Sequence, residues 1–247
     1  MYIRYIFVLL SLLVLISLTS GSLSAKLLFH DDFEKDTIGS EPSKWEIGFN
    51  GKTKAEVVAD PKDASNNVLK TSTNPSNDSR HDGPGSSIYV CGNENWDDYV
   101  AEWDMMFPDD FYMGVVFRFQ DGEKFYLSDR RLGGKVYQFY KRQNGSWPLI
   151  GDGMVDNSPQ VWYRAQLILD GASFTFKLKE RNDKTPFDSI DPATVADDGD
   201  CKTGKFGNYG LVFIDNLFIG DKVEDLVLPV EPSDKLSTTW GVIKAAY

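Results

Sequence analysis

The chain has 247 residues and a formal net charge of −11 at pH 7. An acidic surface repels phosphate backbones, which argues against nucleic acid as a partner. Only two cysteines and two histidines are present, so a zinc or iron site of standard type is not expected. Divalent cations and neutral glycans remain compatible with this composition.

Residues 1–25 have the pattern of a secretory signal peptide. Arg4 is followed by an apolar run of 13 residues that begins at Ile6, and then by small residues. That order is typical of an export signal, and the run is short for a bilayer span, which needs about 20 residues. Cleavage between Ser22 and Ala25 leaves a secreted or cell-surface protein of charge −12 with no membrane span. An uncleaved membrane anchor is the alternative.

The middle of the chain alternates apolar and polar residues with a period of two. Segments 98–107 and 113–120 both follow this pattern, which predicts β-strands rather than helices. Turn residues separate such runs at regular intervals, at 121–123, 133–134, 144–147 and 170–171. Turns at this spacing between runs of Tyr, Phe and Val predict β-hairpins.

The last part of the mature chain continues the strand pattern. Segment 161–180 predicts another hairpin, and a helix is suggested only near the C-terminus, where Ser233 or Asp234 would cap it unless the segment is a flexible tail. Many strands without intervening helices predict an all-β, antiparallel, two-sheet sandwich or jelly roll. We assign residues 26–220 to this domain and residues 221–247 to a C-terminal extension.

The two cysteines lie in polar, loop-like segments. An exported protein meets an oxidising compartment, so an even count favours a disulfide between Cys91 and Cys201. The alternative is two unpaired thiols that lie far apart in space.

Eight segments then follow one another in a recognisable order: DDFEKDTIGSEPSKWE, NNVLKTS, WDDYVAEWDMMF, GVVFRFQDGEKFYLS, VYQFYKRQNGSWPLI, VWYRAQLIL, GKFGNYGLVF and IDNLFIG. This order resembles the concanavalin A-like, laminin-G-like jelly-roll superfamily, particularly extracellular domains related to the 3-keto-disaccharide hydrolase group. The resemblance covers about residues 29–220. It implies two antiparallel sheets, one of them concave, with glycans bound on the concave face or at one rim. The fold hosts lectins, carbohydrate-binding modules, glycosidases and lyases, so it does not specify an activity.

The resemblance also implies a structural calcium ion that ties the first strand to the last. The matching ligands are Asp31 or Asp32 and Asp215. Ca²⁺ takes six to eight oxygen ligands, and carboxylates with loop carbonyls supply them. The alternative is that Asp215 only begins a strand or hydrogen-bonds a turn.

Glu102 and Asp104 form the clearest acidic pair, two residues apart on one face of a predicted strand. The segment is similar to the strand motif of laminarinase-like glycosidases, in which a further Glu is the acid/base. Here Met106 or Phe107 stands where that Glu belongs, and retaining hydrolysis needs two carboxyl groups. The simpler interpretation is two acids that pair with a neighbour such as Arg118.

Several aromatic residues near Arg118 suggest a glycan platform instead. Planar rings stack on the C–H faces of sugars, while guanidinium and carboxylate groups hydrogen-bond the hydroxyls. The predicted ligand-binding set is Glu102, Asp104, Arg118, Tyr126, Tyr140 and Trp147. Arg118 as a mere counter-charge for the acids remains an equal alternative.

The sequence therefore predicts a secreted, non-catalytic protein that binds extracellular carbohydrate, with calcium as a structural ion. A glycoside hydrolase or polysaccharide lyase on the same fold is the first alternative, with Glu102 and Asp104 as its catalytic residues, assisted by Arg118 and Tyr126. A structural or adhesive surface protein is the second alternative, in which the C-terminal extension docks a partner.

Overall fold

The computed structural model describes residues 26–49, 54–71, 88–110, 112–131 and 133–228. The predicted signal peptide and the predicted C-terminal helix or tail lie outside these residues. Within the described part of the chain, no helix is long and apolar enough to cross a membrane.

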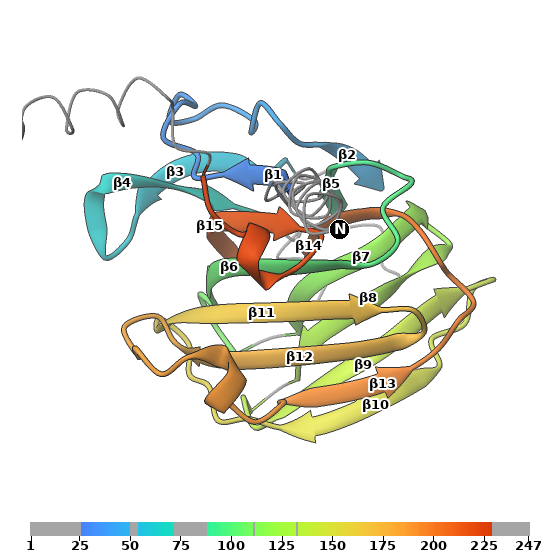
Figure 1. Cartoon of the computed structure of the whole chain (residues 1–247). Helices are drawn as coiled ribbons and strands as arrows, with labels where there is room; N and C mark the ends of the chain where they lie inside the picture. Colours follow the sequence, from blue (N-terminus) through green and yellow to red (C-terminus); the bar gives the residue numbers. More distant parts are fainter. Residues whose placement is uncertain (1–25, 50–53, 72–87, 111, 132, 229–247) are drawn as a thin grey trace, which may run out of the picture.

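The described chain folds into two antiparallel β-sheets (Figure 1). The first sheet runs in the order β13 (Thr194–Asp197), β12 (Ser173–Glu180), β11 (Trp162–Asp170), β6 (Tyr99–Met106), β15 (Phe213–Gly220), β4 (Asp63–Lys70) and β3 (Glu56–Asp60), and β1 (Leu27–Asp31) also pairs with β15. The second sheet runs in the order β10 (Leu149–Met154), β9 (Val136–Gln143), β8 (Lys124–Arg130), β7 (Met113–Asp121), β14 (Lys205–Tyr209), β5 (Ile88–Cys91) and β2 (Glu46–Phe49). Two short 3₁₀ turns, η1 (Phe187–Ser189) and η2 (Val223–Asp225), complete the described elements. The predicted all-β, two-sheet sandwich is confirmed.

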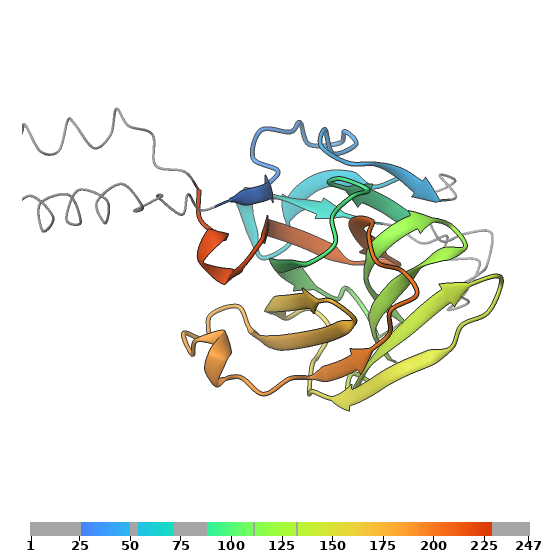
Figure 2. The same ribbon diagram turned by 45° about the vertical axis from the view of Figure 1, so that its right-hand side comes forward.

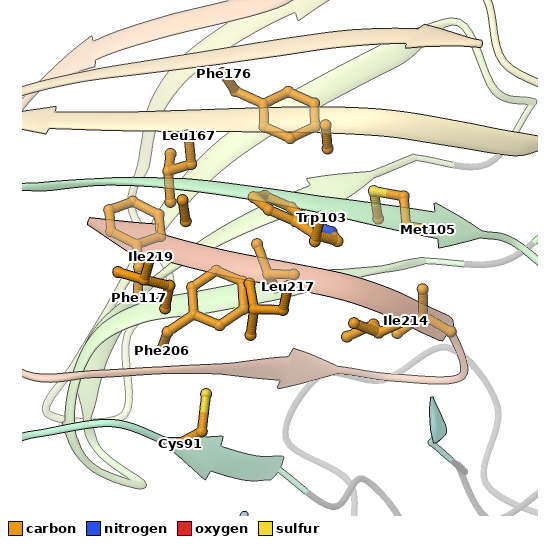
Figure 3. Packing of buried hydrophobic residues seen from close by; sticks show 14 of the residues in the cluster. Cys91, Trp103, Met105, Phe117, Leu167, Phe176, Phe206, Ile214, Leu217 and Ile219 are labelled. Atoms are coloured by element: carbon orange, nitrogen blue, oxygen red, sulfur yellow. The ribbon is translucent and has the colours of Figure 1, made fainter. Parts of the chain in front are cut away.

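The period-two pattern places one face of each strand in a core between the sheets (Figure 3). Trp103 of β6 packs edge-on against Phe206 of β14 in the opposite sheet, with ring centroids 5.2 Å apart. Tyr137 of β9 stacks on Phe176 of β12 at 4.2 Å. Because burying each such side chain contributes about 1.5–3 kcal/mol, these contacts between sheets hold the sandwich together.

Along one side the two sheets meet edge to edge, where β10 lies beside β13 (Figure 1, Figure 2). A Cβ atom added to Gly153 would lie 1.7 Å from the carbonyl oxygen of Ala193, and one added to Gly151 would lie 2.4 Å from that of Val195. Glycine is therefore required at both positions, because the backbones of the two edges approach each other directly.

Two strands contain bulges that reverse the alternation. In β7, Arg118 has φ +46°, and the pairing with β8 shifts register after Phe117. Phe117 consequently packs in the core, whereas Phe119 packs in a second apolar cluster, although a regular strand would place both on one face. The second apolar cluster consists of Ile88, Val90, Val116, Phe119, Phe125, Leu127 and Tyr209. In β15, Asn216 also has φ +46° and lies at a second shift of register.

Candidate functional site

The predicted acids Glu102 and Asp104 lie on the outer face of the first sheet, opposite Gln166 and Arg164 of β11. Arg164 donates to Glu102 Oε2 at 3.3 Å and to Asp104 Oδ1 at 3.2 Å. Gln166 donates to Glu102 Oε1 at 2.8 Å. The acids therefore pair with a neighbouring arginine, as predicted, but the arginine is Arg164 and not Arg118.

The bulge in β15 extends this arrangement to Asp215. Asn216 donates its side-chain amide to Asp104 Oδ2 at 3.1 Å and to Asp215 Oδ2 at 2.9 Å. Asn66 also donates to Asp215 Oδ2, at 3.0 Å, and the backbone N–H of Asn216 donates to Asp215 Oδ1. Burial is the main cause that raises the pKa of Asp215 to about 6, and the nearby Asp104 charge adds to it. Every carboxylate oxygen of Glu102, Asp104 and Asp215 accepts a hydrogen bond, and we call these three residues the acidic network.

Arg118 is buried inside the sandwich, with 1% of its surface exposed. It donates to Asp98 Oδ1 at 3.0 Å and to the backbone oxygen of Cys201 at 3.2 Å. Its guanidinium carbon lies 5.2 Å from the centre of the Phe174 ring. The bulge turns Arg118 inward, away from both the acidic network and the surface, so this geometry does not support contact with a ligand.

Tyr126 is also a core residue. Its ring stacks on Phe117 with centroids 5.3 Å apart. Its hydroxyl donates to Asp198 Oδ1 at 2.5 Å and accepts the backbone N–H of Cys201 at 3.0 Å. Burial raises the pKa of Tyr126. Tyr126 therefore anchors a loop to the core and offers no stacking surface for a sugar.

Tyr140 and Trp147 lie on the outer face of the second sheet, and both are half-buried against the second apolar cluster. Trp147 packs edge-on against Phe125 at 5.7 Å, with the guanidinium of Arg142 4.9 Å from its ring centre. The six predicted ligand-binding residues are thus divided among two opposite faces and the interior. Of these six residues, only Tyr140 and Trp147 are half-buried aromatic residues, and they share the outer face of the second sheet.

Each of the predicted calcium ligands has its own hydrogen-bond partners. Asp31 accepts hydrogen bonds from Lys44 at 3.0 Å and from the indole N–H of Trp45 at 3.0 Å. Asp32 Oδ1 accepts a hydrogen bond from the backbone N–H of Glu34 at 3.3 Å, while Asp215 belongs to the acidic network. Among the described residues no group of three or more His, Cys, Asp or Glu side chains is placed to hold a metal ion. The structural calcium ion therefore stays a prediction.

The predicted disulfide is not present. Cys91 and Cys201 are free thiols, and both are buried. Cys91 lies on β5 facing the core, and Asp31, Lys205 and Lys44 are the charges that act on it. The charges that act on Cys201 form a different set, in which Lys124 and Asp198 are the largest. Both thiols belong to the core between the sheets, and burial raises the pKa of each, which disfavours the reactive thiolate.

A second polar arrangement lies on the outer face of the second sheet. The strand register places Gly114, Asp129, Gln138 and Asp152 side by side across β7, β8, β9 and β10. Asp129 is completely buried, Gln138 is half-buried and Asp152 is exposed. Because successive residues of a strand face opposite sides, Asp129 shares its face with Leu127 of the second apolar cluster.

Arg131 follows β8 directly and pairs with Asp129. It donates to Asp129 Oδ2 at 2.9 Å, and its own side chain is 22% exposed. The other oxygen, Asp129 Oδ1, is buried and has no hydrogen-bond partner. Burial raises the pKa of Asp129 to about 7, although the neighbouring Arg131 charge acts to lower it.

Two tyrosines complete this arrangement. The guanidinium carbon of Arg131 lies 4.0 Å from the ring centre of Tyr112 and 5.1 Å from that of Tyr140. The Tyr140 hydroxyl donates to Gln138 Oε1 at 2.8 Å. We call Tyr112, Asp129, Arg131, Gln138 and Tyr140 the polar patch.

Of the polar patch, the sequence prediction included only Tyr140. A signal for Asp129 was available, because it occupies the position where the alternation through Phe125 and Leu127 predicts another apolar residue. Tyr112 precedes its strand, and no sequence spacing relates it to Arg131. Only the pairing of β7 with β8 brings them together.

The sandwich has the fold of the concanavalin A-like jelly-roll proteins, as predicted. No family model matches the chain, and no curated protein matches its sequence. The similarity to known proteins is therefore one of structure.

Three solved structures illustrate this structural similarity. The carbohydrate-binding module CBM66 of Bacillus subtilis has a TM-score of 0.51 at 15% identity, over 72% of this chain and 95% of that chain. A B. subtilis protein of unknown function with a galectin-like fold has a TM-score of 0.52 at 13% identity, over 79% and 96%. A xylan β-1,4-xylosidase of Bacillus halodurans has a TM-score of 0.52 at 10% identity, over 77% of this chain but only 38% of that chain. At such identities the likeness establishes the fold alone.

Proposed function

We propose that the protein is a secreted, non-catalytic carbohydrate-binding protein, and that its ligand binds at the polar patch on the outer face of the second sheet. The observation that carries the proposal is the Arg131 guanidinium, which is partly exposed and lies over two tyrosine rings. Export follows from the signal-peptide pattern of residues 1–25.

The patch offers the groups that sugar recognition needs. A half-exposed tyrosine ring stacks on the C–H face of a sugar, while planar donors and amide groups hydrogen-bond its hydroxyls. Tyr140 and Tyr112 supply the rings, Arg131 supplies donors, and Gln138 supplies an amide that Tyr140 orients. Because Asp129 pairs with Arg131, these groups are held in place before a ligand arrives, which reduces the entropy lost on binding.

Two of the structurally similar proteins bear names that refer to carbohydrate, a carbohydrate-binding module and a xylan xylosidase. They support the class of ligand and suggest where a screen should begin. Neutral xylan oligosaccharides are the first candidates, since one of these similar structures is a xylan β-1,4-xylosidase.

A screen of neutral oligosaccharides by isothermal titration calorimetry, followed by product analysis of every mixture, tests the proposal. We expect saturable binding without products, and loss of that binding in the Arg131→Ala variant. Glu102→Gln is the matched control, because it alters the acidic network on the opposite face. Products from a bound glycan would favour the hydrolase or lyase alternative, and binding lost only in Glu102→Gln would place the ligand on the other sheet.

A further inference from the structure

The charges at the polar patch suggest which sugars it accepts. Arg131 is the cation of the patch, and the completely buried Asp129 faces it at 2.9 Å. Asp152 follows two strands further across the same face. A buried carboxylate with one oxygen unpartnered is costly.

We propose that Asp129 is a specificity-determining residue, which restricts the polar patch to uncharged sugars by neutralising Arg131. This inference rests on the proposed glycan-binding function and names the class of ligand. Asp129 is completely buried and therefore acts through Arg131 rather than by touching the sugar.

The physical reason is the cost of placing like charges together. A uronic acid whose carboxylate approaches Arg131 also approaches Asp129 behind it and Asp152 beside it, and such juxtapositions disfavour a wrong partner. A neutral hydroxyl accepts a hydrogen bond from the guanidinium without this repulsion. The patch therefore discriminates by charge while the two tyrosine rings supply affinity to either ligand.

The same geometry makes the discrimination depend on pH. The groups that act on Asp129 or face it from neighbouring strands are Arg131, Tyr112, Tyr137, Tyr140 and Asp152. An arginine keeps its charge throughout the ordinary range of pH, and burial raises the pKa of Tyr137 and of Tyr140, so both remain neutral. Asp129, with its pKa near 7, is the group that takes up a proton below neutrality. The negative charge that Asp129 places next to Arg131 is then removed, which favours the approach of a carboxylate.

Calorimetry with two ligands of matched length tests the inference. The neutral ligand is the best-binding oligosaccharide of the screen, and the charged ligand is an oligogalacturonate. The proteins are the wild type, Asp129→Asn and the control Glu94→Gln, which removes one negative charge from an exposed loop position away from the patch. Thermal unfolding confirms that each variant is folded.

We expect the wild type at about pH 8 to bind the neutral ligand in preference, and Asp129→Asn to raise the ratio of galacturonate to neutral affinity about tenfold. Glu94→Gln should leave the ratio unchanged. Lowering the pH to about 5.5 should raise the ratio for the wild type but not for Asp129→Asn. This pH comparison uses the wild type and can therefore be made even if the variant does not fold.

A ratio that is the same in folded Asp129→Asn and the wild type, or that does not change with pH, overturns the inference and leaves the glycan-binding proposal intact. Preference of the wild type for galacturonate at about pH 8 also overturns it. If the wild type binds no oligosaccharide at all, the proposed function fails, and this inference fails with it.

Discussion

Both outer faces of the sandwich carry carboxylates that pair with an arginine. They differ in whether every carboxylate oxygen has a hydrogen-bond partner. On the first sheet, every carboxylate oxygen of the acidic network accepts a hydrogen bond, from Arg164, Gln166, Asn66 or Asn216. On the second sheet, the buried Asp129 has one oxygen without a partner, and the arginine that holds the other oxygen reaches the surface.

In our proposal, this difference distinguishes a structural network from a binding site. A saturated network has no hydrogen-bonding capacity left for a ligand, and a ligand would have to break existing bonds to enter it. An incomplete network keeps a cost that folding alone does not explain, and such groups are concentrated at functional sites. The predicted ligand-binding set included Glu102 and Asp104 of the acidic network but only Tyr140 of the polar patch, which we propose as the site.

The first effect expected from breaking this comparison is on stability. Arg164→Ala leaves Glu102 and Asp104 facing each other without a cation, and we expect the free energy of unfolding to fall by about 2–3 kcal/mol. Chemical denaturation measures it. Lys26→Ala is the control, because its pair with Asp221 is largely exposed and such pairs contribute little. Loss of glycan affinity in Arg164→Ala with unchanged stability would instead make the acidic network the site.

The second expected effect is the pH dependence of stability caused by Asp129. Its folded-state pKa of about 7 lies above the ordinary value, so its contribution is present at low pH and is lost as pH rises through about 7. Each pKa unit corresponds to about 1.4 kcal/mol. The free energy of unfolding of the wild type should therefore fall relative to that of Asp129→Asn between about pH 4 and pH 8.

Asp215, whose pKa is raised to about 6, acts in the same direction in both proteins and cancels in the difference. Denaturation curves measured across this pH range test the prediction. Parallel stability profiles of the wild type and Asp129→Asn would show that Asp129 does not titrate as described.

The third effect is on affinity. Arg131→Ala removes the donor and the cation that lies over both rings, and we expect affinity for a neutral oligosaccharide to fall at least about tenfold. Arg131→Lys keeps the charge but loses the planar group that stacks on the rings, so an intermediate loss is expected. Full affinity in Arg131→Ala, measured by calorimetry, would exclude the polar patch as the site.

The smallest effect concerns Tyr140. Tyr140→Phe keeps the ring but removes the hydroxyl that donates to Gln138, so affinity should fall only about two- to fivefold. Tyr140→Ala removes the stacking surface as well, so affinity should fall further. Equal affinity of Tyr140→Ala and the wild type would mean that the ring does not contact the sugar.

The sequence predicted the elements well, because a period of two is encoded locally. The hairpin of β11 and β12, with Asp170 opposite Ser173 across the turn, follows directly from its pattern. The second apolar cluster could not be predicted, because local alternation does not determine which strands pair in one sheet.

The site was harder to predict for two physical reasons. A bulge cannot be read from alternation, and the one at Arg118 reversed the direction of the side chain chosen as a ligand contact. Pairing between strands also decides which charges meet: Glu102 lies beside Arg164, which is 62 residues away, rather than beside the nearer Arg118. Tyr112 and Arg131 become neighbours in the same way.

The most direct test of the account is the position of a bound sugar. A titration of isotope-labelled protein with a neutral oligosaccharide, followed by NMR chemical shifts, locates the ligand residue by residue. We predict that the largest shifts fall on β8, β9 and the residues around Arg131, Gln138 and Tyr140. Shifts concentrated on β6 and β11, around Glu102 and Gln166, would contradict the account and return the acidic network as the binding site.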